Sequence, residues 1–295
     1  MSTTMVTVGS KRVLASPSYR PAVAHDDELV GRDHECRMVL AAWLPQPGAP
    51  PMAPLLLGEP GVGKNRLVYE LARMTRKALY VLQGHEDITA EDLACAVRFS
   101  DDPERKMDYV LSPLATAMLH GGIAFIDEIG KLRPRALAPL ASVLDDRRYL
   151  DSTLLGERIT AHPGFRFVAA TNAVDLGREG LPDFVRSRVR PVIEVGYPER
   201  EEVDRIVRRR VARLAGDGEG LLSHFWGLWD RHRAGTLPSP RDTLYVFGLT
   251  MSLADLEAGA ADPAGPGSEA GVACPQPRHL EEAFRQIFEA GARAA

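Results

Sequence analysis

Short apolar runs alternate with helical patterns over the first two-thirds of the chain. Runs that predict buried strands lie at 55–57, 78–82, 123–126, 165–170 and 192–195. Between them apolar residues recur every three to four positions, as in Leu67, Leu71 and Met74, which is the spacing of one helix face. This alternation predicts an α/β fold with a doubly wound parallel sheet over residues 26–197.

The pattern changes at both ends of this region. After Pro198 the periodicity is wholly helical, which predicts a small all-helical domain over 198–295. Residues 1–25 mix Ser, Thr and Pro with isolated Val and show no period, so we expect a flexible tail there. Residues 83–111 are weakly patterned and predict an exposed insertion, whereas 148–161 predict a hairpin around Gly156.

Composition narrows the class of protein. The chain has 295 residues, 45% of them hydrophobic, and 36 basic against 40 acidic residues, giving a net charge of −4. This balance disfavours nucleic acid as a partner. Three scattered cysteines indicate neither a disulfide framework nor a zinc site. With no apolar run of ~18 residues and no charged-then-apolar leader, we expect a cytoplasmic protein without a membrane span.

A glycine-rich turn after the first predicted strand is the strongest chemical signal. Gly58, Gly61 and Gly63 let the backbone wrap tightly and turn its N–H groups inward as an anion cradle, and Lys64 adds a positive charge. The pattern G-x-x-x-x-G-K-[ST] is met up to its last position, where Asn65 stands. The candidate nucleotide-binding residues of this turn are Glu59, Pro60, Gly61, Val62, Gly63, Lys64, Asn65 and Arg66.

Two carboxylates follow the strand at 123–126. Asp127 and Glu128 lie where an open α/β sheet places its ligand chemistry, at the carboxyl end of a strand. Asp127 is the candidate Mg²⁺ ligand together with the Asn65 amide oxygen, and Glu128 is the candidate base that polarises the attacking water. Because Asn65 replaces a hydroxyl residue with a neutral amide whose NH₂ can also face the metal, its role stays open.

These motifs resemble those of the AAA+ ATPases, within them the MoxR-type branch that includes CbbQ, NorQ and GvpN-like proteins. The resemblance extends from about residue 27 to the C-terminus and implies a P-loop NTPase domain followed by a helical lid. The motifs that carry it are 58–64 (Walker A), 123–128 (Walker B) and 162–172, which is similar to the sensor-1 strand of this branch.

The resemblance also assigns roles to further residues. It implies that Asn172 positions the attacking water, and that Val30 and Gly31 pack against the adenine. The stretch 181–189 is similar to the one whose arginine reaches across a subunit boundary, and it selects Arg188 as that finger, with Arg186 second. The motif at 238–241 implies that Arg241 approaches the γ-phosphate from the lid.

We therefore expect an ATP-binding, Mg²⁺-dependent remodelling or activation ATPase. The resemblance implies a homo-oligomeric ring, a hexamer, with active sites between subunits. It also implies a partner with a von Willebrand factor A domain and a client protein. The alternative is a nucleotide-gated scaffold that assembles on ATP but hydrolyses it slowly or not at all because of Asn65. A DNA-dependent motor is disfavoured by the net charge.

Overall fold

The computed structural model describes residues 4–20, 29–100, 102–103, 105–176, 180–215, 218–233, 235–259 and 273–290. They fall into two compact units. The first contains the N-terminal segment and residues 32–59 and 64–195. The second contains residues from Gly196 onward together with the short segments 29–31 and 60–63. Each unit is described by itself.

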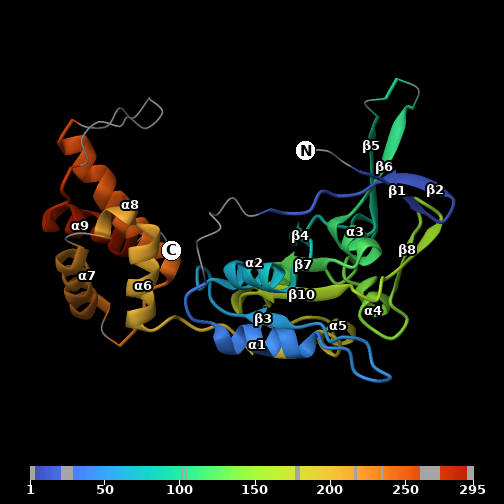
Figure 1. Ribbon diagram of the computed structural model, residues 1–295, viewed down its shortest axis with the longest axis horizontal. Coiled ribbons are helices and arrows are strands. Elements are labelled where there is room, and N and C mark those ends of the chain that lie inside the picture. Colours follow the sequence, from blue (N-terminus) through green and yellow to red (C-terminus); the bar gives the residue numbers. More distant parts are fainter. Residues whose placement is uncertain are drawn as a thin grey trace. The chain divides into compact units, whose positions relative to one another are not determined.

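A five-stranded parallel sheet forms the centre of the first unit, as the alternating pattern predicts (Figure 1). Its strands are β3 (Leu55–Leu57), β4 (Leu79–Gln83), β7 (Ile123–Asp127), β10 (Arg166–Thr171) and β11 (Val192–Glu194), in the order β11-β3-β10-β7-β4. Every residue of β7 is buried, which is why that strand reads as a continuous apolar run. The register pairs Thr171 with Leu57 and Gln83 with Asp127, so the carboxyl ends of these strands meet at one edge.

The helices of the first unit bury apolar residues in its core. They are α1 (Asp33–Ala42), α2 (Lys64–Thr75), α3 (Pro113–His120), α4 (Leu140–Val143) and α5 (Asp183–Arg186). Helix α2 starts directly after the glycine-rich turn and buries Leu67, Val68 and Leu71 against the sheet. Trp43, at the end of α1, donates its indole N–H to the Phe167 carbonyl at 2.9 Å and so fixes α1 to β10.

The predicted flexible tail is wrong for residues 4–20. Strands β1 (Met5–Val8) and β2 (Lys11–Leu14) form an antiparallel hairpin, and β2 pairs with β6 (Met107–Leu111). Val8, Val13 and Leu14 are buried. Four-residue strands give too short a pattern to recognise, and their stability comes from β6, about a hundred residues away in the sequence.

Three hairpins join into what we call the head, made of β1, β2, β5 (Cys95–Phe99), β6, β8 (Tyr149–Ser152) and β9 (Glu157–Thr160). The first four strands form one sheet in the order β1-β2-β6-β5, and the predicted hairpin β8–β9 lies beside it (Figure 1). Glu157 accepts hydrogen bonds from the Ser10 N–H and hydroxyl at 2.9 and 2.8 Å. Because β2 also pairs with β6, all three hairpins are linked. Glu91, in the turn before β5, accepts from the hydroxyls of Ser152 and Thr153.

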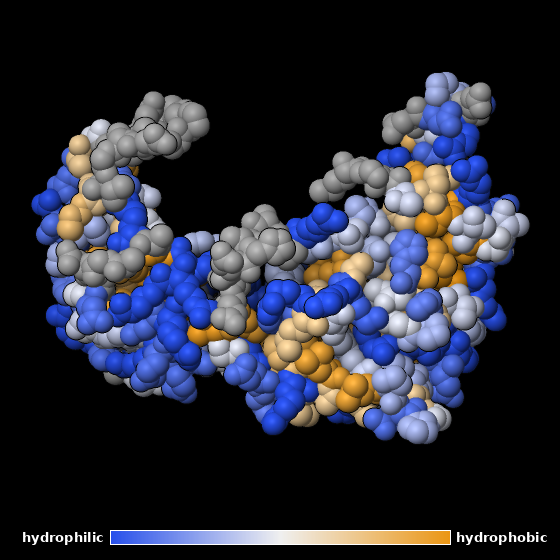
Figure 2. All heavy atoms as spheres, in the orientation of Figure 1, coloured by the Kyte–Doolittle hydropathy of each residue, from blue (hydrophilic) through white to orange (hydrophobic). Residues whose placement is uncertain are grey.

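Residues 83–111 were expected to form an exposed insertion, and the structure shows that they contain the hairpin β5–β6. Its register pairs Val97 with Tyr109 and Phe99 with Met107, so these four side chains share one face. All four are exposed, Phe99 by 84%. Figure 2 shows apolar surface on the head, where the four-stranded sheet lies.

Every regular element among the described residues of the second unit is a helix. It contains α6 (Arg200–Arg210), α7 (Gly218–Arg233), α8 (Pro240–Glu257) and α9 (Pro277–Phe284), followed by a π-helical segment, Arg285–Ala290. Phe225 of α7 is fully buried and packs against Trp229, Phe247 and Phe284. Trp226 and Trp229 thus belong to the core side of α7. Among the described residues no helix combines the length and the apolar character that crossing a membrane requires.

Candidate nucleotide-binding site

The glycine-rich turn has the backbone that an anion cradle requires. Gly61 and Gly63 have φ values of 84° and 101°, which residues with a Cβ rarely adopt. Lys64, at the start of α2, is buried, with 8% of the residue exposed. It donates to the carbonyls of Gly58 and Glu59 at 2.6 and 3.0 Å and to the Asn172 side-chain oxygen at 2.7 Å.

Asn65 meets Asp127 as the sequence predicts, but the atoms in contact differ. The Asn65 amide nitrogen donates to Asp127 Oδ2 at 2.7 Å, so the two residues form a donor–acceptor pair rather than two oxygen ligands side by side. The other carboxylate oxygen of Asp127 accepts from the Glu128 N–H at 3.0 Å. Burial raises the pKa of Asp127, and the hydrogen bond from Asn65 opposes that shift.

Glu128 follows Asp127 with a left-handed backbone, φ 56°, which turns its side chain out of the strand direction. Its Oε2 atom accepts from the Gln83 amide at 2.6 Å and pairs with the Lys131 ammonium at 2.9 Å. Both contacts use the same oxygen and leave Oε1 outside them. The sequence reasoning missed Gln83 and Lys131, although Gln83 directly follows a predicted strand.

Asn172, at the end of β10, is oriented from both sides. Its oxygen accepts from Lys64, and its amide nitrogen donates to Asp175 Oδ2 at 2.7 Å. These two bonds fix which end of the amide faces Lys64. Asp175, in the 3₁₀ turn Val174–Leu176, was not predicted as a site residue.

The two candidate finger arginines make other contacts within their own chain. Arg188 donates to the Phe184 carbonyl at 2.7 Å and lies 3.5 Å from Asp145 Oδ2. Its buried Nε has no hydrogen-bond partner among the described residues. The side chain of Arg186 pairs with Asp183 and is 59% exposed, against 29% for Arg188. Neither arginine bonds to Lys64, Glu128 or Asn172.

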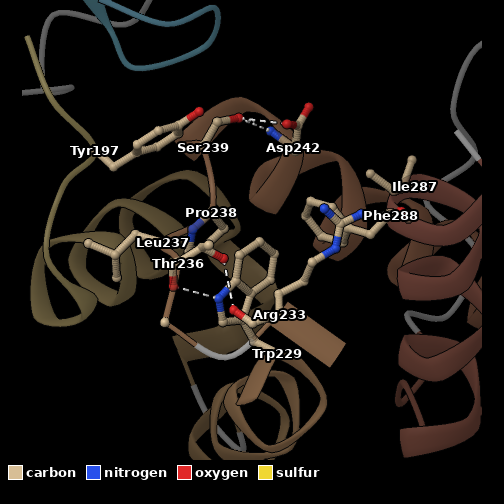
Figure 3. A pocket seen from close by; sticks show the side chains of 11 residues that line it. Tyr197, Trp229, Arg233, Thr236, Leu237, Pro238, Ser239, Asp242, Ile287 and Phe288 are labelled. Atoms are coloured by element: carbon tan, nitrogen blue, oxygen red, sulfur yellow. Dashed lines mark hydrogen bonds between the residues drawn. The ribbon is translucent and has the colours of Figure 1, made fainter. Parts of the chain in front are cut away.

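Val30, Gly31 and Arg241 belong to the second unit, so their roles toward nucleotide stay predictions. Arg241 is exposed in the first turn of α8, whose N-terminus is capped by Ser239 through a 3.1 Å bond from the Asp242 N–H. This capping residue also lines a pocket of about 750 Å³ within the same unit (Figure 3). Trp229, Arg233 and Phe288 face this pocket, but Arg241 is not among its lining residues.

The first unit fits a nucleoside triphosphate with Mg²⁺. In this unit Lys64 supplies the positive charge for phosphate oxygens at the start of α2. Among the described residues no cluster of three His, Cys, Asp or Glu side chains is arranged to hold a metal ion. Mg²⁺ keeps several waters and binds through one or two carboxylates plus substrate phosphates. Asp127 is the carboxylate available for it.

Comparison with known proteins agrees with this geometry. Residues 54–189 match the family model of the AAA domain, dynein-related subfamily. The match begins just before β3 and ends after α5, so the matched region holds every element that carries Lys64, Asp127, Glu128, Asn172 and Arg188.

Two of the similar curated proteins are uncharacterized proteins of staphylococci. An uncharacterized protein of Staphylococcus saprophyticus is 28% identical over 165 residues, 55% of this chain and 62% of its own length. One from Staphylococcus epidermidis is 29% identical over 172 residues, 58% of this chain and 64% of its own. The chain thus spans under two-thirds of the length of these curated relatives.

Solved structures show the fold. A mutant of RuvB from Thermotoga maritima matches with a TM-score of 0.53 at 20% identity, covering 88% of this chain and 71% of RuvB. The RuvB Holliday junction branch migration motor of the same organism matches with a TM-score of 0.51 at 16% identity, covering 87% and 70%. These similarities confirm the predicted P-loop NTPase fold with a helical C-terminal region.

Proposed function

We propose that this chain is an AAA+ ATPase that binds ATP with Mg²⁺ and hydrolyses it. The observation that carries the proposal is the side-chain network at the ends of β3, β7 and β10. In it Lys64 bonds to Asn172, and Asn65 bonds to Asp127. The network brings the phosphate-binding turn together with a metal-binding carboxylate and a water-positioning amide, which are the parts that phosphoryl transfer to water requires.

Glu128 takes the role of general base in this mechanism. Gln83 and Lys131 hold its Oε2, so Oε1 is the atom that accepts the proton of the attacking water. Asn172 orients that water, and Lys64 balances negative charge on the transferred phosphoryl group. Mg²⁺ held by Asp127 would supply Lewis-acid charge to the phosphates. General-base catalysis of this kind contributes about 10²–10⁴-fold to the rate.

The finer proposal is a MoxR-like remodelling ATPase that works as a hexameric ring. Arg188 completes the site of a neighbouring subunit, since in its own chain it bonds to Phe184 and Asp145 instead of the Lys64 network. Val30 and Gly31 bind the adenine, and Arg241 reaches the γ-phosphate from the lid. The partners are a von Willebrand factor A domain protein and a client protein.

One observation favours a second function, a nucleotide-gated scaffold without effective hydrolysis. The Asn65 nitrogen, not its oxygen, faces Asp127. An N–H donor there occupies a carboxylate oxygen that a metal ion would otherwise use. In this alternative the protein binds ATP and assembles, but turns over too slowly to act as a motor.

Phosphate release by three purified proteins separates the two functions. For the ATPase, Glu128→Gln lowers kcat by about 10²–10⁴-fold because the base is lost. Its binding of a fluorescent ATP analogue is unchanged. Asn65→Thr, which restores the hydroxyl of the motif, changes kcat by less. If wild type is no faster than Glu128→Gln while Asn65→Thr gains activity, the scaffold function holds and the ATPase proposal fails.

A further inference from the structure

A group of three cations lies at the edge of the central sheet opposite the Lys64 network. Lys77 precedes β4, Arg166 opens β10, and Arg148 precedes the neighbouring hairpin strand β8. Because the central strands are parallel, the amino ends of β4 and β10 lie at the edge away from Asp127 and Asn172. This cluster is therefore separate from the candidate ATP site.

The three side chains converge on the carbonyls of three successive residues, 163–165. Lys77 Nζ donates to the Gly164 carbonyl at 2.7 Å, and also to that of Gly121 at 3.0 Å. Arg166 donates to the carbonyls of Pro163 and Phe165 at 3.0 and 2.8 Å. Arg148 donates to the Phe165 carbonyl at 3.2 Å. All three cations are thus held close to one another by neutral partners.

The positive charge of this cluster is not balanced within the described residues. No carboxylate among them lies within ion-pair distance of Lys77, Arg148 or Arg166, whereas the nearby Arg158 pairs with Asp151 at 2.7 Å. All three cations are half-buried. Burial lowers the pKa of Lys77 and of Arg148, and repulsion from Arg166 lowers both further. Like charges brought together in partial burial cost stability unless an anion offsets them.

We propose that Lys77, Arg148 and Arg166 bind a compact phosphate-type oxyanion, either free phosphate or a phosphate monoester. A doubly charged tetrahedral group offers enough acceptors for three converging cations, and a guanidinium can bond two of its oxygens at once. A single carboxylate would leave more of the charge unbalanced. An extended nucleic acid would need a long basic surface, and the chain as a whole carries a net charge of −4.

The test measures thermal unfolding with inorganic phosphate against sodium chloride at equal ionic strength and pH. All proteins carry Lys64→Ala, so that the glycine-rich turn does not contribute. At about ten times the dissociation constant, phosphate raises the midpoint of the parent by about 3–6 °C. Arg166→Gln abolishes this increment. Arg158→Gln is the matched control: it removes the same charge from a residue that already has a carboxylate partner, and it keeps the increment.

A purely structural role for the cluster gives a different result. If the cations only hold the 163–165 carbonyls, Arg166→Gln lowers the midpoint in chloride but leaves the phosphate increment equal to that of Arg158→Gln, and the proposal is overturned. If Arg166→Gln does not fold, Arg148→Gln and Lys77→Met must each reduce the increment, and no reduction in either overturns it.

The source of the phosphate is resolved by two more probes under the same conditions. A phosphoserine peptide that stabilises the parent, but not Arg166→Gln, identifies a monoester. Stabilisation by inorganic phosphate alone identifies the free ion. Stabilisation by poly-glutamate with no response to either phosphate probe contradicts the proposed ligand class.

Discussion

The pairing of Asn65 with Asp127 decides how this site differs from its motif. The motif calls for a hydroxyl at position 65, and the structure has an amide that gives its N–H to the carboxylate. A hydrogen bond to a charged group stabilises it by about 1.5–3 kcal/mol. Asn65 therefore supports the ionised form of a carboxylate whose burial disfavours that form.

At the residue scale we predict that Asp127→Asn stabilises the protein near neutral pH. Because burial raises the pKa of Asp127, the stability linked to this group is present at acid pH and is lost as pH rises through the folded-state pKa. The neutral amide avoids that loss, so the unfolding midpoint rises by about 2–4 °C if the net cost is about 1 kcal/mol. Thermal unfolding at about pH 7 and about pH 4 checks this, the gain being smaller at the lower pH.

Asp151→Asn is the control, because the pKa of Asp151 is shifted in the opposite direction from that of Asp127. The hydrogen bond from Arg158 lowers the pKa of Asp151, so this carboxylate favours the folded state above its ordinary pKa. Its replacement leaves the midpoint unchanged or lowers it. Equal responses of the two variants would contradict an effect of burial at Asp127.

At the scale of elements, the head holds the main difference between expectation and structure. The hairpin β1–β2 was expected to be a flexible tail because residues 1–25 show no hydrophobic period. It is ordered by pairing with β6 and by the burial of Val13 and its neighbours. Long-range pairing of this kind leaves almost no local signal in a sequence.

We predict that Val13→Ala destabilises the protein although it lies far from the nucleotide site. Val13 is 1% exposed, and removing two buried methyl groups costs about 1–3 kcal/mol. Arg12→Ala, one residue earlier on the exposed face of the same strand, stays within about 0.5 kcal/mol of wild type. Chemical denaturation measures both. Equal, negligible effects would mean that the hairpin does not pack as described.

Long elements and strand-end motifs were predictable, whereas features that depend on register were not. The five strands of the central sheet followed from apolar runs, and the positions of Lys64, Asp127 and Asn172 followed from motifs at strand ends. Helix α3 was missed because it is apolar nearly all round and therefore shows no amphipathic period. Gln83 donates a hydrogen bond to Glu128 because the register of β4 and β7 pairs Gln83 with Asp127. This register could not be predicted from the sequence.

At the scale of the whole molecule, the central question is whether one chain holds a complete site. In the described residues of the first unit, Lys64, Asp127, Glu128 and Asn172 come together, while both candidate fingers point to other partners. A site that needs an arginine from another chain makes activity a property of the assembly.

Mixing two inactive variants tests this directly. We predict that Arg188→Ala and Glu128→Gln each lose most of the ATP turnover, the finger arginine being worth about 10³-fold or more in such enzymes. Mixed together under assembling conditions, they regain part of it, because some interfaces then combine an intact Glu128 with an intact Arg188. Arg186→Ala is the matched control and keeps most activity. A mixture as inactive as its components would contradict a finger acting between subunits.

The hydrogen bonds of Lys64 determine which contacts change when phosphate binds. Within the chain the ammonium has three oxygen acceptors, one of them on Asn172. A phosphate oxygen that bonds to Lys64 displaces one of these acceptors. Because one hydrogen bond replaces another, the net gain in binding free energy is modest. The displaced partner that matters is Asn172, which stands at the end of a different strand. Phosphate binding at the glycine-rich turn is thereby coupled to the end of β10 through the loss of the Lys64–Asn172 hydrogen bond.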